Sequence, residues 1–134
     1  MLGYDDVNSM RTGIMGYKGR VHYHCAPCID EFLKNLSPDI PKTKVCDVIA
    51  EHIDQQIFRN YRLYPSNYIA LDTLNGDAAH AGEYTAEDKA AFEAYLQGQL
   101  NKIDIQNPDM AFLRERMLTM YANPARNFLA ATKG

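Results

Sequence analysis

Hydrophobic side chains recur every three or four positions along three stretches of the chain, and this period is typical of amphipathic helices. The first stretch runs from Thr43 to about Tyr61, the second opens at Thr85, and the third follows Asn107. We therefore predict a helix in each stretch. The expected apolar stripes are Val45, Val48, Ile49, His52, Ile53, Gln56 and Ile57; then Phe92, Tyr95, Leu96, Leu100 and Ile103; and finally Met110, Leu113, Met117, Met120 and Tyr121.

Capping residues indicate where the last two helices begin. Thr85 and Asp88 have the spacing of a capping box, in which each side chain accepts a backbone donor of the first turn. Asn107 is expected to cap the third helix, because Pro108 then occupies the first helical position, where its missing N–H is harmless. Pro124 is expected to end this helix, with one or two helical turns after it.

A shorter helix is predicted between the turn at Pro65 and the Asn75-Gly76 pair. Pro65 indicates a turn, either Ser66 or Asn67 supplies the cap, and the Asn75-Gly76 pair ends the helix.

The first third of the chain follows a different pattern. Gly13, Gly16 and Gly19 predict a glycine-rich turn, and residues 20–26 favour a β-strand that Pro27 stops. Successive strand side chains point to opposite faces. Val21, Tyr23 and Cys25 should therefore share one face, while His22, His24 and Ala26 share the other.

Together these elements predict a mainly α fold with a short β element at the N-terminus and three to four helices packed as one small domain, 1–134. Its parts are a glycine-rich turn and strand remnant (1–30), a helical segment (43–74) and a helical tail (85–131). A strand without partners leaves its backbone donors and acceptors unpaired. A homodimer through this N-terminal β edge is one way to cover them.

Composition and charge narrow the class of protein. The chain has 134 residues, enough for one domain with a core, and its 17 acidic and 14 basic residues are mixed along it, so no basic face for nucleic acid stands out. No apolar run approaches the roughly 20 residues that span a bilayer, and the N-terminus lacks a signal-peptide pattern. We expect a cytoplasmic protein, peripheral at most on the inner face of the membrane.

The chain's three cysteines are an odd number and fit reduced thiols better than a disulfide framework. Cys25, Cys28, Cys46 and His52 have a spacing similar to that of a zinc site with three cysteines and one histidine. Cys46 and His52 are six residues apart on one predicted helix, however, and so point about 120° apart around its axis.

The segment from His22 to Cys28 allows two other interpretations. His22 and His24 share a strand face and need only a third ligand to bind a metal. Cys25 and Cys28 have the spacing of a redox pair, although the βαβ context of such pairs is absent. A stand-alone metal-binding or helical interaction module using these four residues is therefore the alternative function. The favoured interpretation is a strand that binds no metal, and we expect no cofactor.

No nucleophile, nucleotide-binding or dinucleotide-binding motif is present. The stretch "GIMGYKGR" places three glycines beside Lys18 and Arg20, and such a loop can hold a phosphate. Arg62, at the end of the long helix, is a third candidate for contact with an anionic substrate. A turn entering a strand explains the same glycines without any ligand.

Two stretches, "GIMGYKGRVHYHCAPCI" and "IDQQIFRNYRLYPSNYIALD", resemble the C-terminal part of bacterial glycerolipid acyltransferases of the lysophosphatidate (1-acylglycerol-3-phosphate) acyltransferase type. The resemblance covers about residues 12–72. It implies that the first stretch is a late strand of a catalytic α/β domain, and that the helices after residue 83 are a tail of one subgroup.

The same family requires a histidine followed five positions later by an aspartate, which this chain lacks. The residues at that offset from His22, His24, His52 and His80 are Pro27, Ile29, Ile57 and Thr85. The resemblance therefore implies a non-catalytic C-terminal region. The whole enzyme would move an acyl chain from acyl-CoA or acyl carrier protein to a lysophospholipid in phospholipid biosynthesis.

Overall fold

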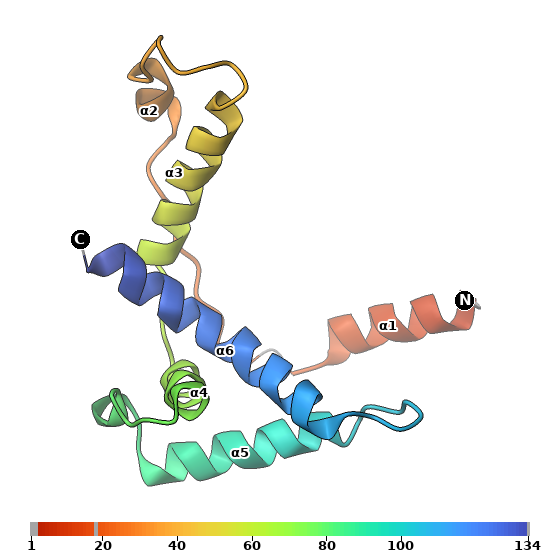
Figure 1. Ribbon diagram of the computed structural model, residues 1–134. Coiled ribbons are helices and arrows are strands. Elements are labelled where there is room, and N and C mark those ends of the chain that lie inside the picture. The colour runs from red at the N-terminus through yellow and green to blue at the C-terminus, as the bar shows by residue number, and fades with distance from the viewer. Residues whose placement is uncertain (1–2, 18, 134) are drawn as a thin grey trace.

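The computed structural model describes residues 3–17 and 19–133, and within them the chain is all-α, with six α-helices, one 3₁₀ turn and no β-strand (Figure 1). The elements are α1 (Gly3–Met15), α2 (Asp30–Lys34), α3 (Val45–Arg59), α4 (Pro65–Asn75), the 3₁₀ turn η1 (Ala81–Glu83), α5 (Ala86–Leu100) and α6 (Met110–Thr132).

The hydrophobic core lies between α4, α5 and α6. We call these three helices the helical unit. In Figure 1, α6 crosses α4, and both pack against α5. Leu96 is fully enclosed at the centre, and an enclosed leucine stabilises a fold by about 1.5–3 kcal/mol relative to an exposed one. The core residues are Ile69, Ala70, Leu71, Phe92, Leu96, Leu118, Ala122 and Ala125.

Three alanines allow α4 and α6 to approach closely. Ala70 on α4 and Ala122 and Ala125 on α6 are completely buried. Because their side chains are single methyl groups, the two helices meet almost backbone to backbone. This crossing positions α6 within the helical unit.

The prediction that Pro124 ends the last helix is wrong, because α6 continues through it to Thr132. A proline inside a helix removes one backbone hydrogen bond and costs about 3 kcal/mol. Ala122 and Ala125, on either side of the proline, are packed against the core, and this packing outweighs the local cost. The helix also begins two residues later than predicted, with Asp109 accepting a hydrogen bond from the Phe112 amide, while Asn107 has a φ of 54° and is not the cap.

The apolar stripe predicted for α6 is confirmed only in part: Met117 and Tyr121 pack against the core, but the most buried residues lie beside this stripe. Met110 and Met120 are exposed, whereas Leu118, Ala122 and Ala125 are buried. The pattern of large apolar residues missed this face because the α4–α6 crossing is built largely from alanine.

Two other helix ends agree with the sequence. The Thr85–Asp88 capping box forms, with the Asp88 carboxylate accepting from the Thr85 amide at 2.9 Å and the Thr85 hydroxyl accepting from the Asp88 amide at 3.1 Å. Gly76 ends α4 with a φ of 70°, the left-handed conformation that glycine adopts most easily. The predicted start of α4 is wrong: the helix begins at Pro65 with Tyr64 at the cap position, and Asn67 is its third residue, whose side chain accepts from the Tyr64 amide.

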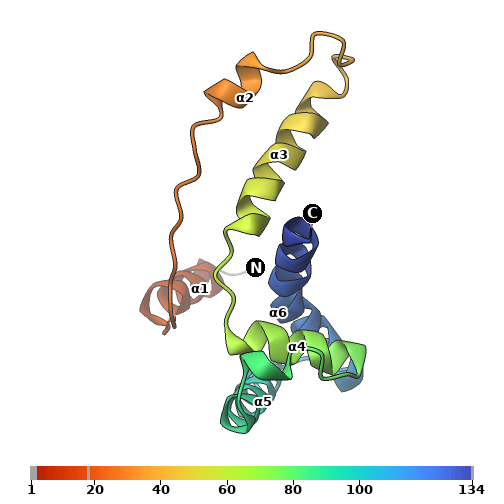
Figure 2. The same ribbon diagram turned by 90° about the vertical axis from the view of Figure 1, so that its left-hand side faces the viewer.

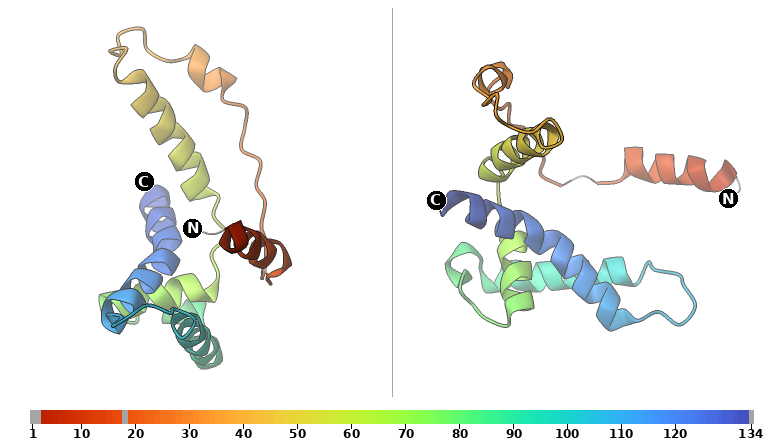
Figure 3. Two further views of the ribbon diagram at one scale, coloured as in Figure 1. Left: turned by 90° about the vertical axis from the view of Figure 1, so that its right-hand side faces the viewer. Right: turned by 45° about the horizontal axis from the view of Figure 1, so that its top comes forward.

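The first half of the chain has no core of its own. No residue of the ranges 5–17 and 19–62 is buried, whereas the buried residues that the structure describes all lie between Asn67 and Ala131. Helix α1 stands apart from the other helices in all views (Figures 1 to 3). Helix α3, predicted over residues 43–61, is confirmed, but it meets the helical unit only at its C-terminal end, where the Arg59 side chain donates to the Ala131 carbonyl at 3.2 Å.

The β-strand predicted for residues 20–26 does not form, and residues 19–28 follow an extended course without regular secondary structure. We call residues 19–28 the arm; Figure 2 shows it running from the end of α1 to α2, alongside α3. A strand is defined by its backbone partners, and the described residues offer the arm none. The described residues form six α-helices, whereas three to four were expected, because the sequence pattern missed α1 and the short α2.

Candidate functional site

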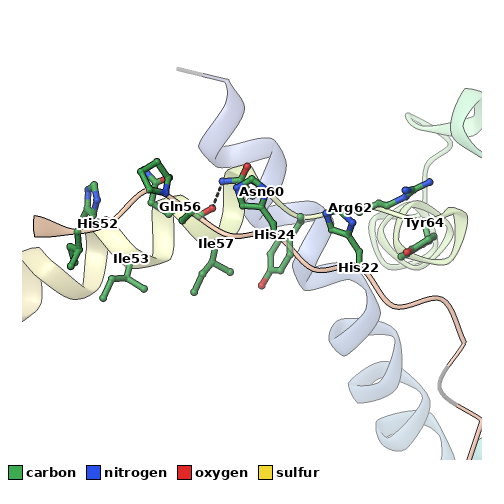
Figure 4. Close-up of a pocket in the computed structure, with 13 residues that line it drawn as sticks. His22, His24, His52, Ile53, Gln56, Ile57, Asn60, Arg62 and Tyr64 are labelled. Carbon is green, nitrogen blue, oxygen red and sulfur yellow. Dashed lines mark hydrogen bonds between the residues drawn. The ribbon is translucent and has the colours of Figure 1, made fainter. Parts of the chain in front are cut away.

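A groove of about 420 Å³ lies between the arm and α3 (Figure 4). This volume falls within the range of natural binding pockets. The lining residues are His22, His24, Ala26, Pro27, Ile29, His52, Ile53, Gln56, Ile57, Asn60, Tyr61, Arg62 and Tyr64.

Side chains along the arm alternate as a strand's would. His22, His24 and Ala26 line the groove and so face α3, whereas Val21 and Tyr23 do not line it and are 59% and 88% exposed. The predicted separation of the arm into two faces therefore holds, although the arm has no strand partner. One face lines the groove and the other does not, and all residues of the arm are exposed.

The arm's backbone is unpaired. Among the described residues, no backbone hydrogen bond involves positions 19–28, and the first one after the arm is donated by the Leu33 amide to the Ile29 carbonyl. Within the described part of the chain, backbone hydrogen bonds therefore do not fix the course of the arm.

The α3 wall of the groove is apolar at its centre. Ile53 and Ile57, one turn apart, are 43% and 46% exposed. Figure 4 shows both beside the arm. At one end of this wall, the His52 ring stacks on Phe32 of α2 with ring centroids 3.7 Å apart. At the other end, the side-chain amide of Asn60 donates to the backbone carbonyl of Gln56 at 2.7 Å.

The predicted phosphate contacts fall in two neighbouring cavities. Arg62 lines the groove, with its guanidinium 6.0 Å from the centre of the Tyr64 ring. Arg20 lines a second cavity of about 450 Å³, which also includes Asp88, and Tyr64 borders both. Lys18 lies outside the residues that the structure describes. Arg20 and Arg62 are therefore not brought to one anion site.

The metal-ligand candidates do not converge. No group of three or more histidine, cysteine, aspartate or glutamate side chains in the described ranges is arranged to hold a metal ion. Cys25, Cys28 and Cys46 are free and exposed. His22 and His24 line the groove, where the other polar side chains include Asn60 and Arg62.

A buried polar cluster that sequence reasoning missed lies on the far side of the helical unit. The carboxylate of Asp72, only 2% exposed, meets the His80 ring Nδ1 at 2.6 Å, the His80 amide at 3.0 Å and the Tyr84 hydroxyl at 2.9 Å. Burial raises the pKa of the Asp72 carboxyl, but the hydrogen bonds from His80 and Tyr84 outweigh burial and hold this pKa below its ordinary value. The cluster ties the loop after α4 to α4 itself.

One sequence signal pointed to this cluster. Asp72 lies in the last turn of α4, where the helix dipole disfavours a negative charge. An aspartate at that position, directly after the apolar run Ile69–Leu71, indicates a tertiary partner.

A pair of tyrosines marks the face where α5 meets α6. The Tyr121 hydroxyl donates to the Tyr95 hydroxyl at 2.9 Å. Burial, together with this hydrogen bond, raises the pKa of Tyr121 to about 12. The Tyr121 hydroxyl therefore keeps its proton at physiological pH, and its hydrogen bond to Tyr95 joins the two helices.

None of the helices in the described part of the chain combines the length and hydropathy that crossing a bilayer requires. Comparison with protein-family models, curated proteins and solved structures found no match to this chain.

Proposed function

We propose that this chain is the C-terminal helical region of a glycerolipid acyltransferase of the lysophosphatidate acyltransferase type, and that it does not catalyse acyl transfer by itself. The whole enzyme would transfer an acyl chain from a carrier thioester to a lysophospholipid-like acceptor at a membrane surface.

The observation that carries this proposal is the division of the chain into two unlike halves. The helical unit has a core, while residues 5–17 and 19–62 contain no buried side chain. A half-chain with amphipathic helices and no core is expected to belong to a larger body that buries its apolar faces. The coreless half includes the arm, and most of the resemblance falls there.

The resemblance follows the same division. Its first stretch covers the end of α1 and the arm, and its second covers the later part of α3 and most of α4. A glycine-flanked, alternating segment followed by an amphipathic helix is the pattern of a strand and its covering helix in an α/β domain. The arm has the alternation and extended course that this role needs.

In this proposal the helical unit braces the catalytic domain from outside. Helix α3 is the link, because its end is joined to α6 through Arg59 and its groove face lies against the arm. Arg62, which lines the groove, is the basic residue proposed to contact a phosphate of the acceptor, because Arg20 lines a separate cavity.

Two measurements test the proposal. The coding DNA directly upstream of Met1 should contain, in frame, a histidine followed five positions later by an aspartate. The polypeptide that includes it should transfer acyl groups from acyl-CoA or acyl carrier protein to lysophosphatidate, whereas the purified 134-residue chain should not. Transfer above background by the 134-residue chain, or a long upstream frame without that pair, would refute the proposal.

A further inference from the structure

We propose that Cys25 and Cys28 form a redox-sensitive modification site on the arm. Oxidation of the two thiols to a disulfide bends the arm, lifts it from α3 and opens the groove. The inference concerns this chain alone and does not depend on the proposed acyltransferase role.

The two cysteines are near neighbours in sequence that the course of the arm keeps apart. Both are free and exposed, and neither lines the groove. Residues 25–28 have no regular secondary structure, and Figure 2 shows the arm running on an extended course beside α3. At about 3.3 Å per residue, an extended chain holds two Cα atoms three residues apart at about 10 Å. The two thiols are therefore accessible to an oxidant but do not meet while the arm is extended.

A disulfide requires a shorter distance. It joins residues whose Cα atoms are about 4.4–6.8 Å apart. Closing the bond between Cys25 and Cys28 therefore forces a turn and shortens this part of the arm by about 3 Å or more, the length of one strand residue. Among the described residues, no backbone hydrogen bond of the arm has to break for this turn to form.

The shortening acts on the side of the arm that faces the groove. Ala26 and Pro27, between the two cysteines, line the groove. Beyond the arm, Phe32 stacks on the His52 ring of α3 with ring centroids 3.7 Å apart. Before the cysteines, Arg20 lines the second cavity together with residues of α4 and α5. A segment placed at both ends cannot lose the length of one residue without releasing one end, so the disulfide and the seated arm exclude each other.

The reaction needs a disulfide oxidant, such as glutathione disulfide. The thiolate of one cysteine attacks a sulfur of the oxidant, which forms a mixed disulfide and releases one thiol. The thiolate of the second cysteine then attacks the protein sulfur of this mixed disulfide, and a second thiol leaves. The protein loses two electrons and two protons, and the oxidant gains them as two thiols. An excess of a dithiol reverses both steps.

Mass spectrometry after incubation with glutathione disulfide tests whether the bond forms. Trypsin cuts the chain so that Cys25 and Cys28 lie in one peptide, 21–34, whereas Cys46 lies in another, 45–59. The first peptide should become lighter by the mass of two hydrogen atoms. The control Cys46→Ser should give the same product, and Cys28→Ser should give only a glutathione adduct. A lasting glutathione adduct on the wild-type peptide, or a bond from this peptide to Cys46, overturns the proposal.

Nuclear magnetic resonance of the histidine rings tests whether the arm moves. The Phe32 ring shifts the Cε1 proton of His52 upfield while the two rings are stacked, and formation of the disulfide should remove this upfield shift. The ring of His80, which Asp72 holds in the helical unit, is the internal reference and should not change. An unchanged His52 signal in a chain whose disulfide has formed overturns the coupling between oxidation and arm release.

The coupling has to be reciprocal, so release of the arm should favour the disulfide. Ile57→Lys places a charge on the apolar α3 wall of the groove. It should raise the equilibrium constant for oxidation of Cys25 and Cys28 in a glutathione buffer at least about fivefold. The matched control Asp54→Lys, on the same helix but outside the groove, should leave this constant unchanged. Equal constants in the wild type and in Ile57→Lys would refute the link between the disulfide and the seating of the arm.

Discussion

The side chain of Asn67 joins the start of α4 to the middle of α6, because its amide donates to the Tyr121 carbonyl at 2.8 Å. Its other atom, Oδ1, accepts from the Tyr64 amide at 2.8 Å and so caps α4. Tyr121 lies in the turn of α6 that precedes Pro124, whose missing N–H would otherwise donate to the Met120 carbonyl. One buried side chain therefore caps α4 and joins it to α6.

Replacing Asn67 with alanine should destabilise the helical unit by about 2–3 kcal/mol, because the change removes a cap and leaves buried backbone groups with fewer partners. Urea denaturation followed by circular dichroism measures this loss. Asn75→Ala, at the exposed end of the same helix, should change the free energy of unfolding by less than about 0.5 kcal/mol. Equal effects of the two substitutions would contradict the bridging role of Asn67.

The Asp72 cluster predicts how stability depends on pH. Since the pKa of Asp72 is lower in the folded state than in the unfolded chain, its charged form stabilises the fold at pH values above its ordinary pKa of about 3.9. This contribution should disappear as the pH falls through the lowered pKa, when the carboxyl takes up a proton.

The measurement compares the wild type with Asp72→Asn in urea denaturation between pH 7 and pH 3. The free energy of unfolding of the variant should be lower than that of the wild type by about 1–3 kcal/mol at pH 7. This difference should become smaller as the pH falls. Asp88 and Glu93 also have lowered pKa values, but they are present in both proteins and cancel in the difference. A gap that stays constant with pH would show that Asp72 acts through its shape alone.

The alanine-lined crossing of α4 and α6 gives a third prediction. Ala125→Leu inserts a large side chain where none of the alanine surface is exposed, and should destabilise the fold by about 1–3 kcal/mol or separate the helices. Ala130→Leu, on the exposed side of α6, should have little effect. Thermal unfolding of both variants measures the difference. Tolerance of Ala125→Leu would mean that α4 and α6 lie further apart than described.

These alanines also explain how far the sequence could predict the fold. Periodicity and caps located α3, α4 and α5, because Thr85, Asp88 and Gly76 are local signals that depend on a few neighbouring residues. The passage of α6 through Pro124 depends instead on packing against α4, which is remote in sequence. A prediction from local signals therefore placed the end of α6 too early.

The candidate site shows the same limit. Alternation along the arm predicted correctly that His22 and His24 share a face, since this follows from backbone geometry alone. The strand itself was wrong within the described residues, because strand formation needs a partner that no local pattern supplies. The Asp72–His80 contact was missed since it joins residues eight positions apart through a loop without periodicity.

The uneven distribution of the core gives the last prediction. Every buried residue in the described part of the chain lies between Asn67 and Ala131, so a fragment of residues 60–134 should fold without the rest of the chain. It should retain helical circular dichroism and a cooperative thermal transition. The fragment 1–62, which has amphipathic helices but no buried residue in its described ranges, should show weak helicity and no cooperative transition, because helices of 13 to 15 residues are marginal in water without packing. If instead fragment 60–134 loses its transition and regains it only when fragment 1–62 is added, α3 is part of the core, and the arm and α3 are not free to dock elsewhere.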